Sequence, residues 1–303
     1  MNNIGRVVKG VGGMFDVLPT DGGARLSCRA RGNLRRGEEK ILVGDLVRVD
    51  TEPGGAVISE VMPRKNALIR PPLSNIDRLY AVLAVREPAP IYETTDKLLC
   101  IAEHNGIAVT VVITKTDMAA PDEAGEIYRK AGYEVFSLSS VTGEGVASLR
   151  EAMRRDLAEG GIAAFAGASG VGKSSLFNAL FPALSLQTGE ISRKIGRGKN
   201  TTRHTELYPV FGEGGGFLAD TAGFSMLDFV RFDFMGTEDL FGTFREFAPY
   251  AADCRFADCR HVKEEECGVR RAVAEGKIAP SRYESYVALD AVLRRKNPFG
   301  GEK

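Results

Sequence analysis

The stretch Gly167-Ala-Ser-Gly-Val-Gly-Lys-Ser174 decides the fold class of this chain. It fits G-x-x-x-x-G-K-[ST] at every fixed position and lies between a predicted strand, residues 162–166, and a predicted helix, residues 174–180. Glycines let such a loop curl so that its backbone N–H groups point at phosphate oxygens. The alternative is a glycine-rich turn that matches by chance, and the strand-loop-helix context disfavours it. The stretch therefore predicts a phosphate-binding loop.

The chemistry of this loop assigns a role to its last residues. Lys173 is expected to reach the β- and γ-phosphates as a point charge, and Ser174 is expected to coordinate Mg²⁺. The residues predicted to contact nucleotide phosphates are Gly167, Ala168, Ser169, Gly170, Val171, Gly172, Lys173, Ser174 and Ser175.

Strands and helices alternate on the N-terminal side of the loop. Residues 79–85 and 108–113 are continuous apolar runs, which are typical of strands covered on both faces. Residues 95–104, 121–131 and 146–157 show the apolar spacing of helices. This alternation predicts an α/β domain with a parallel sheet and helices on both faces.

The choice of base is predicted by two loops that precede the phosphate loop. Thr114, Lys115, Thr116 and Asp117 follow the strand at 108–113, where an Asp carboxylate can accept both N–H groups of the guanine edge. The usual first residue of such a loop is Asn, so Thr114 weakens the match. Ser139 and Ser140 follow one strand and one helix later and resemble a second guanine-contacting loop. A rival interpretation, an ATP-using kinase, predicts no such loop after the strand.

Two further segments follow the phosphate loop. Asp220-Thr-Ala-Gly223 fits D-x-x-G, in which Asp220 is expected to hold Mg²⁺ through water and Gly223 to sense the γ-phosphate. Either Thr201 or Thr202 is expected to be the switch threonine that coordinates Mg²⁺ in the triphosphate state.

The order of these loops predicts a rearranged domain. In ordinary GTPases the phosphate loop comes first and the base-recognition loops last, whereas here both base-recognition loops precede it. We therefore expect a circularly permuted P-loop GTPase domain, cut after the second switch.

The N-terminal segment, residues 1–66, reads as five short strands separated by turns, which favours a small OB-like β-barrel. Residues 1–70 hold 12 basic and 8 acidic residues, although Lys+Arg and Asp+Glu are both 40 in the whole chain. A solvated hairpin and an RNA-facing patch both remain open as interpretations of this charge. The basic residues concerned are Arg25, Arg29, Arg31, Arg35, Arg36 and Lys40.

The C-terminal segment is predicted to be helical and to hold a metal. Cys254, Cys259, His261 and Cys267 supply three thiols and one imidazole, which suits Zn²⁺ in a closed structural site. A set of core cysteines is the alternative, but the stretch is too polar for a core. Further along, residues 281–284 match a capping box, which predicts that a helix opens there.

Composition excludes several classes of protein. Hydrophobic residues make up 44% of the chain and charged residues 26%, which is ordinary for a globular protein. No apolar run approaches the roughly 20 residues that span a bilayer, and the N-terminus lacks the pattern of a signal peptide. We therefore predict a cytoplasmic protein with no membrane partner.

Taken together, these motifs resemble the RsgA (YjeQ/YloQ) family of circularly permuted bacterial GTPases over essentially the whole chain. The resemblance implies an OB-like barrel at 1–68, a permuted GTPase domain at 69–235 and a small helical zinc-binding domain at 236–303. It also implies GTP and GDP as ligands, one structural Zn²⁺, and Mg²⁺ with GTP. The implied partner is the small ribosomal subunit with its rRNA, whose late maturation the protein would assist, with hydrolysis stimulated by the subunit. We predict a monomer.

The catalytic residues are where the chain departs from that family. The family usually has His before the paired threonines, and here Asn200 stands at that position. An amide can hydrogen-bond the attacking water but cannot accept its proton. The predicted catalytic set is Asn200, Thr201, Thr202 and Lys173, with His204 as a nearby substitute. A nucleotide-gated rRNA-binding adaptor with negligible hydrolysis is the alternative function.

Overall fold

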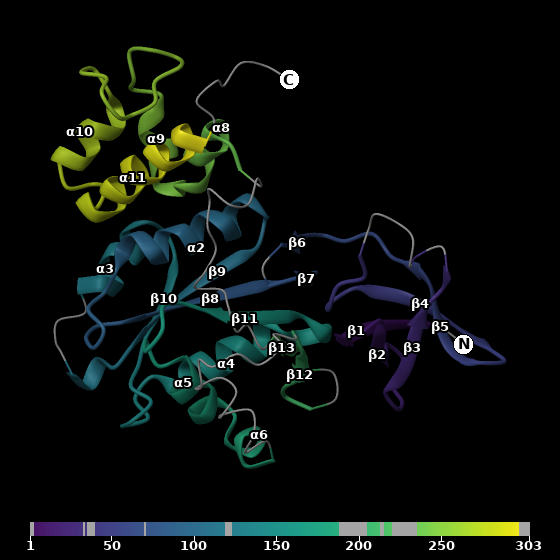
Figure 1. Ribbon diagram of the computed structural model, residues 1–303. Coiled ribbons are helices and arrows are strands. Elements are labelled where there is room, and N and C mark those ends of the chain that lie inside the picture. Colours follow the sequence, from purple (N-terminus) through teal and green to yellow (C-terminus); the bar gives the residue numbers. More distant parts are fainter. Residues whose placement is uncertain are drawn as a thin grey trace. The chain divides into compact units, whose positions relative to one another are not determined.

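The computed structural model describes residues 3–32, 34, 40–69, 71–118, 123–187, 205–212, 215–219 and 235–296 (Figure 1). The chain forms two compact units, which we describe separately. The first unit comprises Met1–Arg78, Glu151–Phe165 and Ala183–Phe224, and the second comprises Leu79–Arg150, Ala166–Pro182 and Ser225–Lys303.

A closed five-stranded barrel opens the first unit, as predicted. Its strands are adjacent in the order β1-β2-β3-β5-β4, and β4 closes onto β1. Neighbouring strands are antiparallel except β3 and β5, which run parallel. The strands are β1 (Ile4–Val11), β2 (Met14–Pro19), β3 (Leu26–Ala30), β4 (Leu46–Glu52) and β5 (Gly55–Val61).

The barrel is filled by one apolar side chain from each strand. Val7, Val17, Cys28, Val47 and Ile58 are all 0% exposed and pack together. Because alternate residues of a strand point to opposite faces, the intervening positions face outward and include the charged residues. Burial raises the pKa of the Cys28 thiol to about 11.

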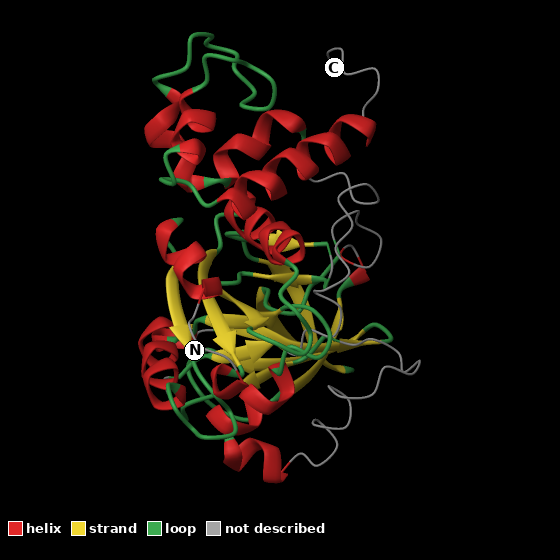
Figure 2. Cartoon of the chain, turned by 90° about the vertical axis from the view of Figure 1, so that its left-hand side faces the viewer, coloured by secondary structure: helices red, strands yellow, loops and turns green. Residues whose placement is uncertain are grey.

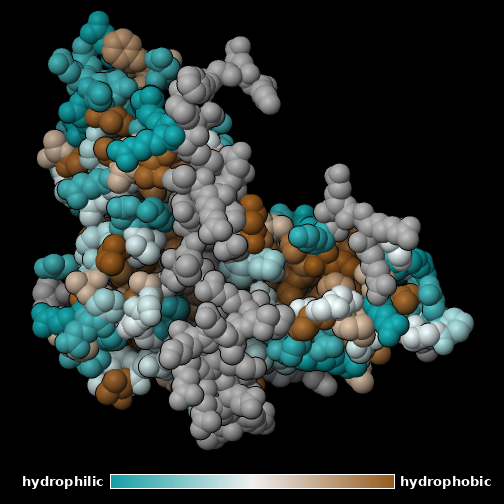
Figure 3. All heavy atoms as spheres, in the orientation of Figure 1, coloured by the Kyte–Doolittle hydropathy of each residue, from teal (hydrophilic) through white to brown (hydrophobic). Residues whose placement is uncertain are grey.

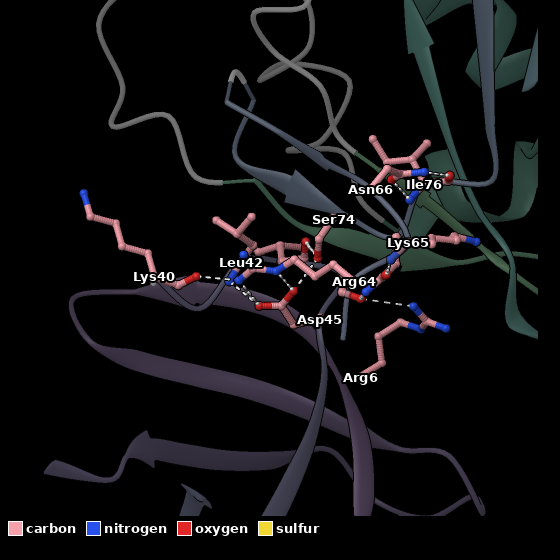
Figure 4. Close-up of polar contacts among 12 residues, drawn as sticks. Arg6, Lys40, Leu42, Asp45, Arg64, Lys65, Asn66, Ser74 and Ile76 are labelled. Carbon is pink, nitrogen blue, oxygen red and sulfur yellow. Dashed lines mark hydrogen bonds and ion pairs between the residues drawn. The ribbon is translucent and has the colours of Figure 1, made fainter. Parts of the chain in front are cut away.

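A buried carboxylate ties the barrel to the chain that leaves it (Figure 4). Asp45 is 0% exposed and accepts hydrogen bonds from Arg64 Nε at 2.7 Å, from Ser74 Oγ at 2.6 Å and from the Leu42 N–H at 2.7 Å. Gly44 beside it is essential, because a Cβ there would lie 2.1 Å from the Ser74 carbonyl oxygen. The fully paired carboxylate therefore fixes the short strands β6 (Ala67–Leu68) and β7 (Leu73–Ser74) against the barrel.

Three strands of the central sheet belong to the first unit: β11 (Ile162–Ala166), β13 (Phe217–Ala219) and β12 (Leu207–Pro209). In sheet order, β11 pairs parallel with β13, and β13 pairs antiparallel with β12. The sheet is therefore mixed, whereas the sequence predicted a parallel one. A short connection joins β12 to β13, and only antiparallel neighbours can be joined without a long crossover.

The second unit holds β10 (Glu134–Ser137), β9 (Ala108–Thr114) and β8 (Arg78–Ala84), adjacent in that order. Helices lie on both sides of the strands (Figure 2), and Figure 1 shows α2 and α3 on one face and α5 on the other. The helices of the second unit here are α2 (Tyr92–His104), α3 (Glu123–Lys130) and α5 (Lys173–Leu180). α4 (Val146–Asp156) is divided between the two units, and α6 (Pro182–Gln187) belongs to the first unit from Ala183 on. The segments predicted as strands, 79–85 and 108–113, are strands, and those predicted as helices, 95–104, 121–131 and 146–157, contain helices.

Helices make up most of the regular structure of the described C-terminal segment, as predicted. They are α8 (Thr237–Leu240), η4 (Phe241–Thr243), η5 (Arg245–Phe247), α9 (Ala248–Ala251), α10 (Gly268–Ala274) and α11 (Pro280–Lys296). α11 packs against α2. Hydrophilic residues cover much of the face of this segment shown in Figure 3. Within the described ranges, no helix is both long and apolar enough to cross a membrane.

The predicted capping box at Ser281 is wrong. α11 begins at Pro280, so Ser281 lies inside the first turn, and its buried Oγ has no hydrogen-bond partner among the described residues. Proline favours the first helical position, because its fixed φ already suits a helix and the N–H that it lacks would have no partner there.

Candidate nucleotide-binding and metal sites

The phosphate loop runs from the end of β11 to the start of α5, as the sequence predicts. Three of its glycines have positive φ: Gly167 (+154°), Gly170 (+82°) and Gly172 (+94°). Gly167 also needs to lack a side chain, because a Cβ there would lie 2.2 Å from the Val82 carbonyl oxygen. The loop therefore takes a backbone shape that other residues would strain.

Lys173 is folded back onto its own loop. Its Nζ donates hydrogen bonds to the carbonyl oxygens of Gly167 at 2.9 Å and Ala168 at 2.7 Å. Burial lowers the pKa of this amine, since desolvation disfavours its charged form. The ammonium is thus held at the mouth of the loop by neutral carbonyl groups, and an anionic phosphate would be a better partner for it.

The first predicted base-recognition loop, Thr114–Asp117, is hydrogen-bonded to the phosphate loop. Thr114 ends β9, is 2% exposed, and donates from Oγ1 to the Val171 carbonyl oxygen at 2.6 Å. The same hydroxyl lies 3.3 Å from the Leu83 carbonyl oxygen at the end of β8. Thr114 weakened the sequence match, but its side chain joins the two loops.

The rest of this loop is held in place from two sides. Lys115 has a φ of +62°, and its Nζ donates to the Glu87 carbonyl oxygen. The Thr116 N–H donates to the Leu138 carbonyl oxygen at 3.3 Å, next to the second base-recognition loop. Asp117 lies in the short helix η1 (Thr116–Met118) and is exposed, so its carboxylate is available to a ligand.

The second predicted base-recognition loop is closed by Ser139, which is 0% exposed. Its Oγ accepts hydrogen bonds from the N–H groups of Val141 at 3.1 Å and Thr142 at 3.2 Å, and its carbonyl oxygen accepts from Gly143 at 2.9 Å. Ser140 is half-buried beside it. Ser139 therefore shapes the loop, and the backbone is what the loop can present to a base.

Several predicted site residues lie outside the described residues. These are Asn200, Thr201, Thr202, His204, Asp220 and Gly223. Their predicted roles in magnesium binding and hydrolysis stay predictions.

The predicted metal ligands come together in the C-terminal segment. The ligand atoms of Cys254, Cys259, His261 and Cys267 all lie within 4.8 Å of one another. His261 Nδ1 lies 3.5 Å from the Cys254 sulfur and 3.3 Å from the Cys267 sulfur, and these two sulfurs are 3.9 Å apart. Zinc–sulfur bonds of about 2.3 Å in a tetrahedron place two sulfurs about 3.8 Å apart, so the donor set fits a metal ion.

Backbone donors and neighbouring helices support this cluster. The Gly268 N–H donates to the Cys254 sulfur at 3.3 Å, and the Arg270 N–H donates to the Cys267 sulfur at 3.5 Å, which favours thiolates. Burial together with the adjacent thiols raises the pKa of Cys259 to about 12, so metal binding would release a proton there. The sequence spacing gave no signal for these N–H donors.

Some of the basic residues predicted to form the RNA-facing patch are paired within the protein. Arg31 Nη2 lies 2.7 Å from Glu52 and 3.0 Å from Asp50, and the hydrogen bond that Arg31 donates to Glu52 raises the pKa of its guanidinium. Arg29 is exposed and forms no ion pair with another described residue. The structure does not describe Arg35 and Arg36. The charge count alone therefore overstated how many cations this surface offers.

Comparisons with known proteins agree with this geometry. The RsgA N-terminal domain family matches residues 4–57, and the RsgA GTPase family matches residues 61–230. The proteins named small ribosomal subunit biogenesis GTPase RsgA from Agathobacter rectalis and Caldanaerobacter subterraneus subsp. tengcongensis are 37% and 40% identical to this chain. The first alignment covers 97% of this chain and 99% of its relative, and the second covers 96% of each.

Two solved structures have the same fold over nearly their full length. YjeQ from Thermotoga maritima superposes with a TM-score of 0.78 at 35% identity, covering 96% of this chain and 98% of that one. YloQ, described as a circularly permuted GTPase, superposes with a TM-score of 0.75 at 31% identity, covering 97% and 95%. With both family matches and this loop order, the chain belongs to the RsgA family of circularly permuted GTPases.

Proposed function

We propose that this GTPase uses Mg²⁺ to hydrolyse GTP in the late maturation of the small ribosomal subunit, and that the subunit stimulates hydrolysis. The relatives above carry the name of small-subunit biogenesis GTPases. The observation that carries the nucleotide part is the bond between Thr114 Oγ1 and the Val171 carbonyl oxygen, because it holds a base loop beside a phosphate loop.

The nucleotide would be held from its two ends. Asp117 would accept the two N–H groups of guanine, and the backbone at Ser139 and Ser140 would meet the base oxygen. Lys173 would leave its two carbonyl partners for the β- and γ-phosphates. Mg²⁺ would be held by Ser174, Thr202 and, through water, Asp220, and the ion would neutralise developing charge on the phosphates.

Asn200 would position the attacking water. Its amide can donate to and accept from water but cannot remove a proton, so we propose an orienting role and no base role. With such a weak catalytic group, the subunit's contribution to the rate would be large.

We propose that the ion at Cys254, Cys259, His261 and Cys267 is Zn²⁺ with a structural role. Three thiols and one imidazole are the donors that zinc prefers, and four ligands leave no position open for a substrate. The ion would therefore stabilise the C-terminal segment.

The barrel, residues 1–68, is proposed to contact rRNA, and residues 69–235 and 236–303 to form the GTPase and zinc-binding domains. We propose that the protein works as a cytoplasmic monomer bound to the subunit.

Single-turnover hydrolysis of GTP, with and without purified small subunits, tests this function. Hydrolysis by the protein alone should be slow, and hydrolysis in the presence of small subunits should be many times faster. Lys173→Ala should weaken binding of a fluorescent GDP, whereas Asn200→Ala should retain that binding and slow the stimulated step. Tight, nucleotide-dependent subunit binding with no stimulated hydrolysis would instead favour the adaptor function.

A further inference from the structure

A small cluster of opposite charges lies where the barrel meets β12. The Glu206 carboxylate forms ion pairs with Lys9 Nζ at 3.0 Å and with Arg25 Nη1 at 3.5 Å. The same Arg25 nitrogen also lies 3.5 Å from the Asp16 carboxylate. The side chains of Lys9 and Arg25 are 37% and 43% exposed, whereas that of Glu206 is 19% exposed. Lys9 and Arg25, two partly exposed cations of the barrel, are thus both ion-paired with the less exposed Glu206 carboxylate.

Glu206 lies at the point where the chain joins both the barrel and the sheet. Its backbone forms an isolated antiparallel bridge with Lys9, and the next residue, Leu207, pairs with Ala219 in the sheet. Ala219 immediately precedes Asp220, and Glu206 follows Thr202 by four positions. Glu206 is therefore close in sequence to one proposed magnesium ligand, Thr202, and is connected to the other, Asp220, through the pairing of β12 with β13.

Contacts other than these ion pairs also attach the barrel to the rest of the first unit. The Arg6 guanidinium lies 5.6 Å from the ring centroid of Phe217 in β13 and donates to the Gly44 carbonyl oxygen at 3.1 Å. Asp77 accepts the Ile162 N–H of β11 at 2.7 Å. Partly exposed pairs such as those of Glu206 are weak, because water screens them, so another anion can replace the carboxylate without detaching the barrel.

We propose that Lys9 and Arg25 bind RNA phosphates and that Glu206 is the internal competitor for them. This inference rests on the proposed RNA contact of the barrel. A phosphate offers the same kind of charge as the carboxylate, so RNA competes with Glu206 for the two cations and engages them only in part while Glu206 is charged. By thermodynamic linkage, a nucleotide state that holds Glu206 against the barrel weakens RNA binding, and bound RNA disfavours that state.

The test compares Glu206→Gln with Glu60→Gln in the full-length protein loaded with GDP. Both variants lose one negative charge from the first unit, and Glu60 is the exposed partner of Arg48 at 3.0 Å elsewhere on the barrel. The probe is a fluorescein-labelled single-stranded RNA, and its anisotropy is measured across a KCl series. Glu206→Gln should bind RNA several-fold more tightly at low salt.

The dependence on salt identifies the mechanism. Each newly engaged phosphate of a single strand steepens the slope of log affinity against log salt by about 0.7. Glu206→Gln should therefore steepen the slope by about 0.7 to 1.4, and Glu60→Gln by clearly less. In a Lys9→Met/Arg25→Met background, Glu206→Gln should have no effect. Equal slopes for the two glutamine variants, or an effect that persists in that background, would overturn the inference.

Nucleotide binding separates this inference from the proposed function. All variants should bind fluorescent GDP like the unaltered protein and show similar thermal unfolding. If neither the unaltered protein nor any variant binds the RNA while GDP binding is intact, the RNA contact of the barrel fails and the inference with it. If RNA binds but Lys9→Met/Arg25→Met does not weaken that binding, the inference fails, whereas the proposed RNA contact of the barrel stands.

Discussion

The hydroxyl of Thr114 and the carbonyl oxygen of Val171 are 2.6 Å apart, although 57 residues separate them in the chain. Thr114 ends the strand that leads into the base loop, and Val171 lies in the middle of the phosphate loop. In the proposed nucleotide site, a buried hydroxyl bonded in this way would set the spacing between the loops for the two ends of the nucleotide. A base loop that begins with Thr therefore keeps a side-chain link to the phosphate loop.

Thr114→Val should weaken GDP binding while preserving the shape of the side chain. It removes a hydrogen bond worth about 1 kcal/mol and leaves the Val171 carbonyl unpaired, so the dissociation constant should rise about 3- to 30-fold. Thr114→Ser, which retains the hydroxyl, is the matched control and should bind almost normally. Fluorescence titration with a labelled GDP measures both, and equal affinity of the two variants would remove the role given to this bond.

Asp117→Asn should change the preferred base. The carboxylate accepts two N–H groups of guanine, and an amide in its place can accept from one side only, while it can donate to the additional oxygen of xanthine. Loss of a hydrogen bond to a charged group predicts a fall in GTP affinity of about 10- to 100-fold. Competition between GTP, xanthosine triphosphate and ATP for the labelled nucleotide measures this. The guanine assignment is wrong if ATP competes as well as GTP in the unaltered protein.

Cys259→Ser should release the metal from the C-terminal segment. The unaltered protein should carry about one zinc ion per chain, and the variant markedly less, because three remaining ligands no longer close the tetrahedron. Asp258→Asn, at an exposed neighbouring position, is the control and should retain the metal. Elemental analysis gives the metal content, and thermal unfolding should show a lower midpoint for Cys259→Ser alone.

Arg282 forms a buried ionic cluster between α11 and α2. It is 1% exposed, and its Nη1 lies 2.6 Å from Asp96 while its Nε lies 2.7 Å from Glu246. Arg282→Met leaves two buried carboxylates without their cation, so the free energy of unfolding should fall by about 3–5 kcal/mol.

A neutral version of the cluster separates charge from packing. Arg282→Met combined with Asp96→Asn and Glu246→Gln removes every charge and should recover most of the lost stability. Urea unfolding of the two variants measures the difference. If the combined variant is as unstable as Arg282→Met alone, uncompensated charge is not the cause.

Glu264 should make stability depend on pH in the acid range. Burial alone would raise the pKa of its carboxyl group, but the N–H groups of Arg260, Val262 and Lys263 donate to it and lower the pKa to about 2. Since the unfolded value is about 4.3, the carboxylate adds stability above that pH, and the contribution is lost as pH falls towards 2.

Glu264→Gln should therefore destabilise the protein at neutral pH by about 1 kcal/mol, the size expected for partly solvated hydrogen bonds. The difference in the free energy of unfolding between the unaltered protein and Glu264→Gln should become smaller from pH 5 to pH 3. Urea unfolding at a series of pH values measures it, with Glu265→Gln at an exposed neighbouring position as the control. A gap that stays constant over this range would contradict the assigned pKa.

Much of the fold and of the candidate site follows from patterns within short stretches of sequence. The phosphate loop, the base loops and the alternation of strands with helices were predicted because each is specified by residues close together in the chain. The four metal ligands also lie within one short segment, and their donor types alone suggest the ion. The same local reasoning failed at Ser281, where the proline before it sets the start of the helix.

What the sequence could not determine is every contact between distant residues. The bond from Thr114 to Val171, the pairs of Arg282 across 186 residues and those of Glu206 across 181 depend on which strands and helices become neighbours. The antiparallel pairing of β12 with β13 is of the same kind. Residue spacing sets local geometry because the backbone has few allowed shapes, whereas partners far apart in the chain are chosen by the packing of whole elements.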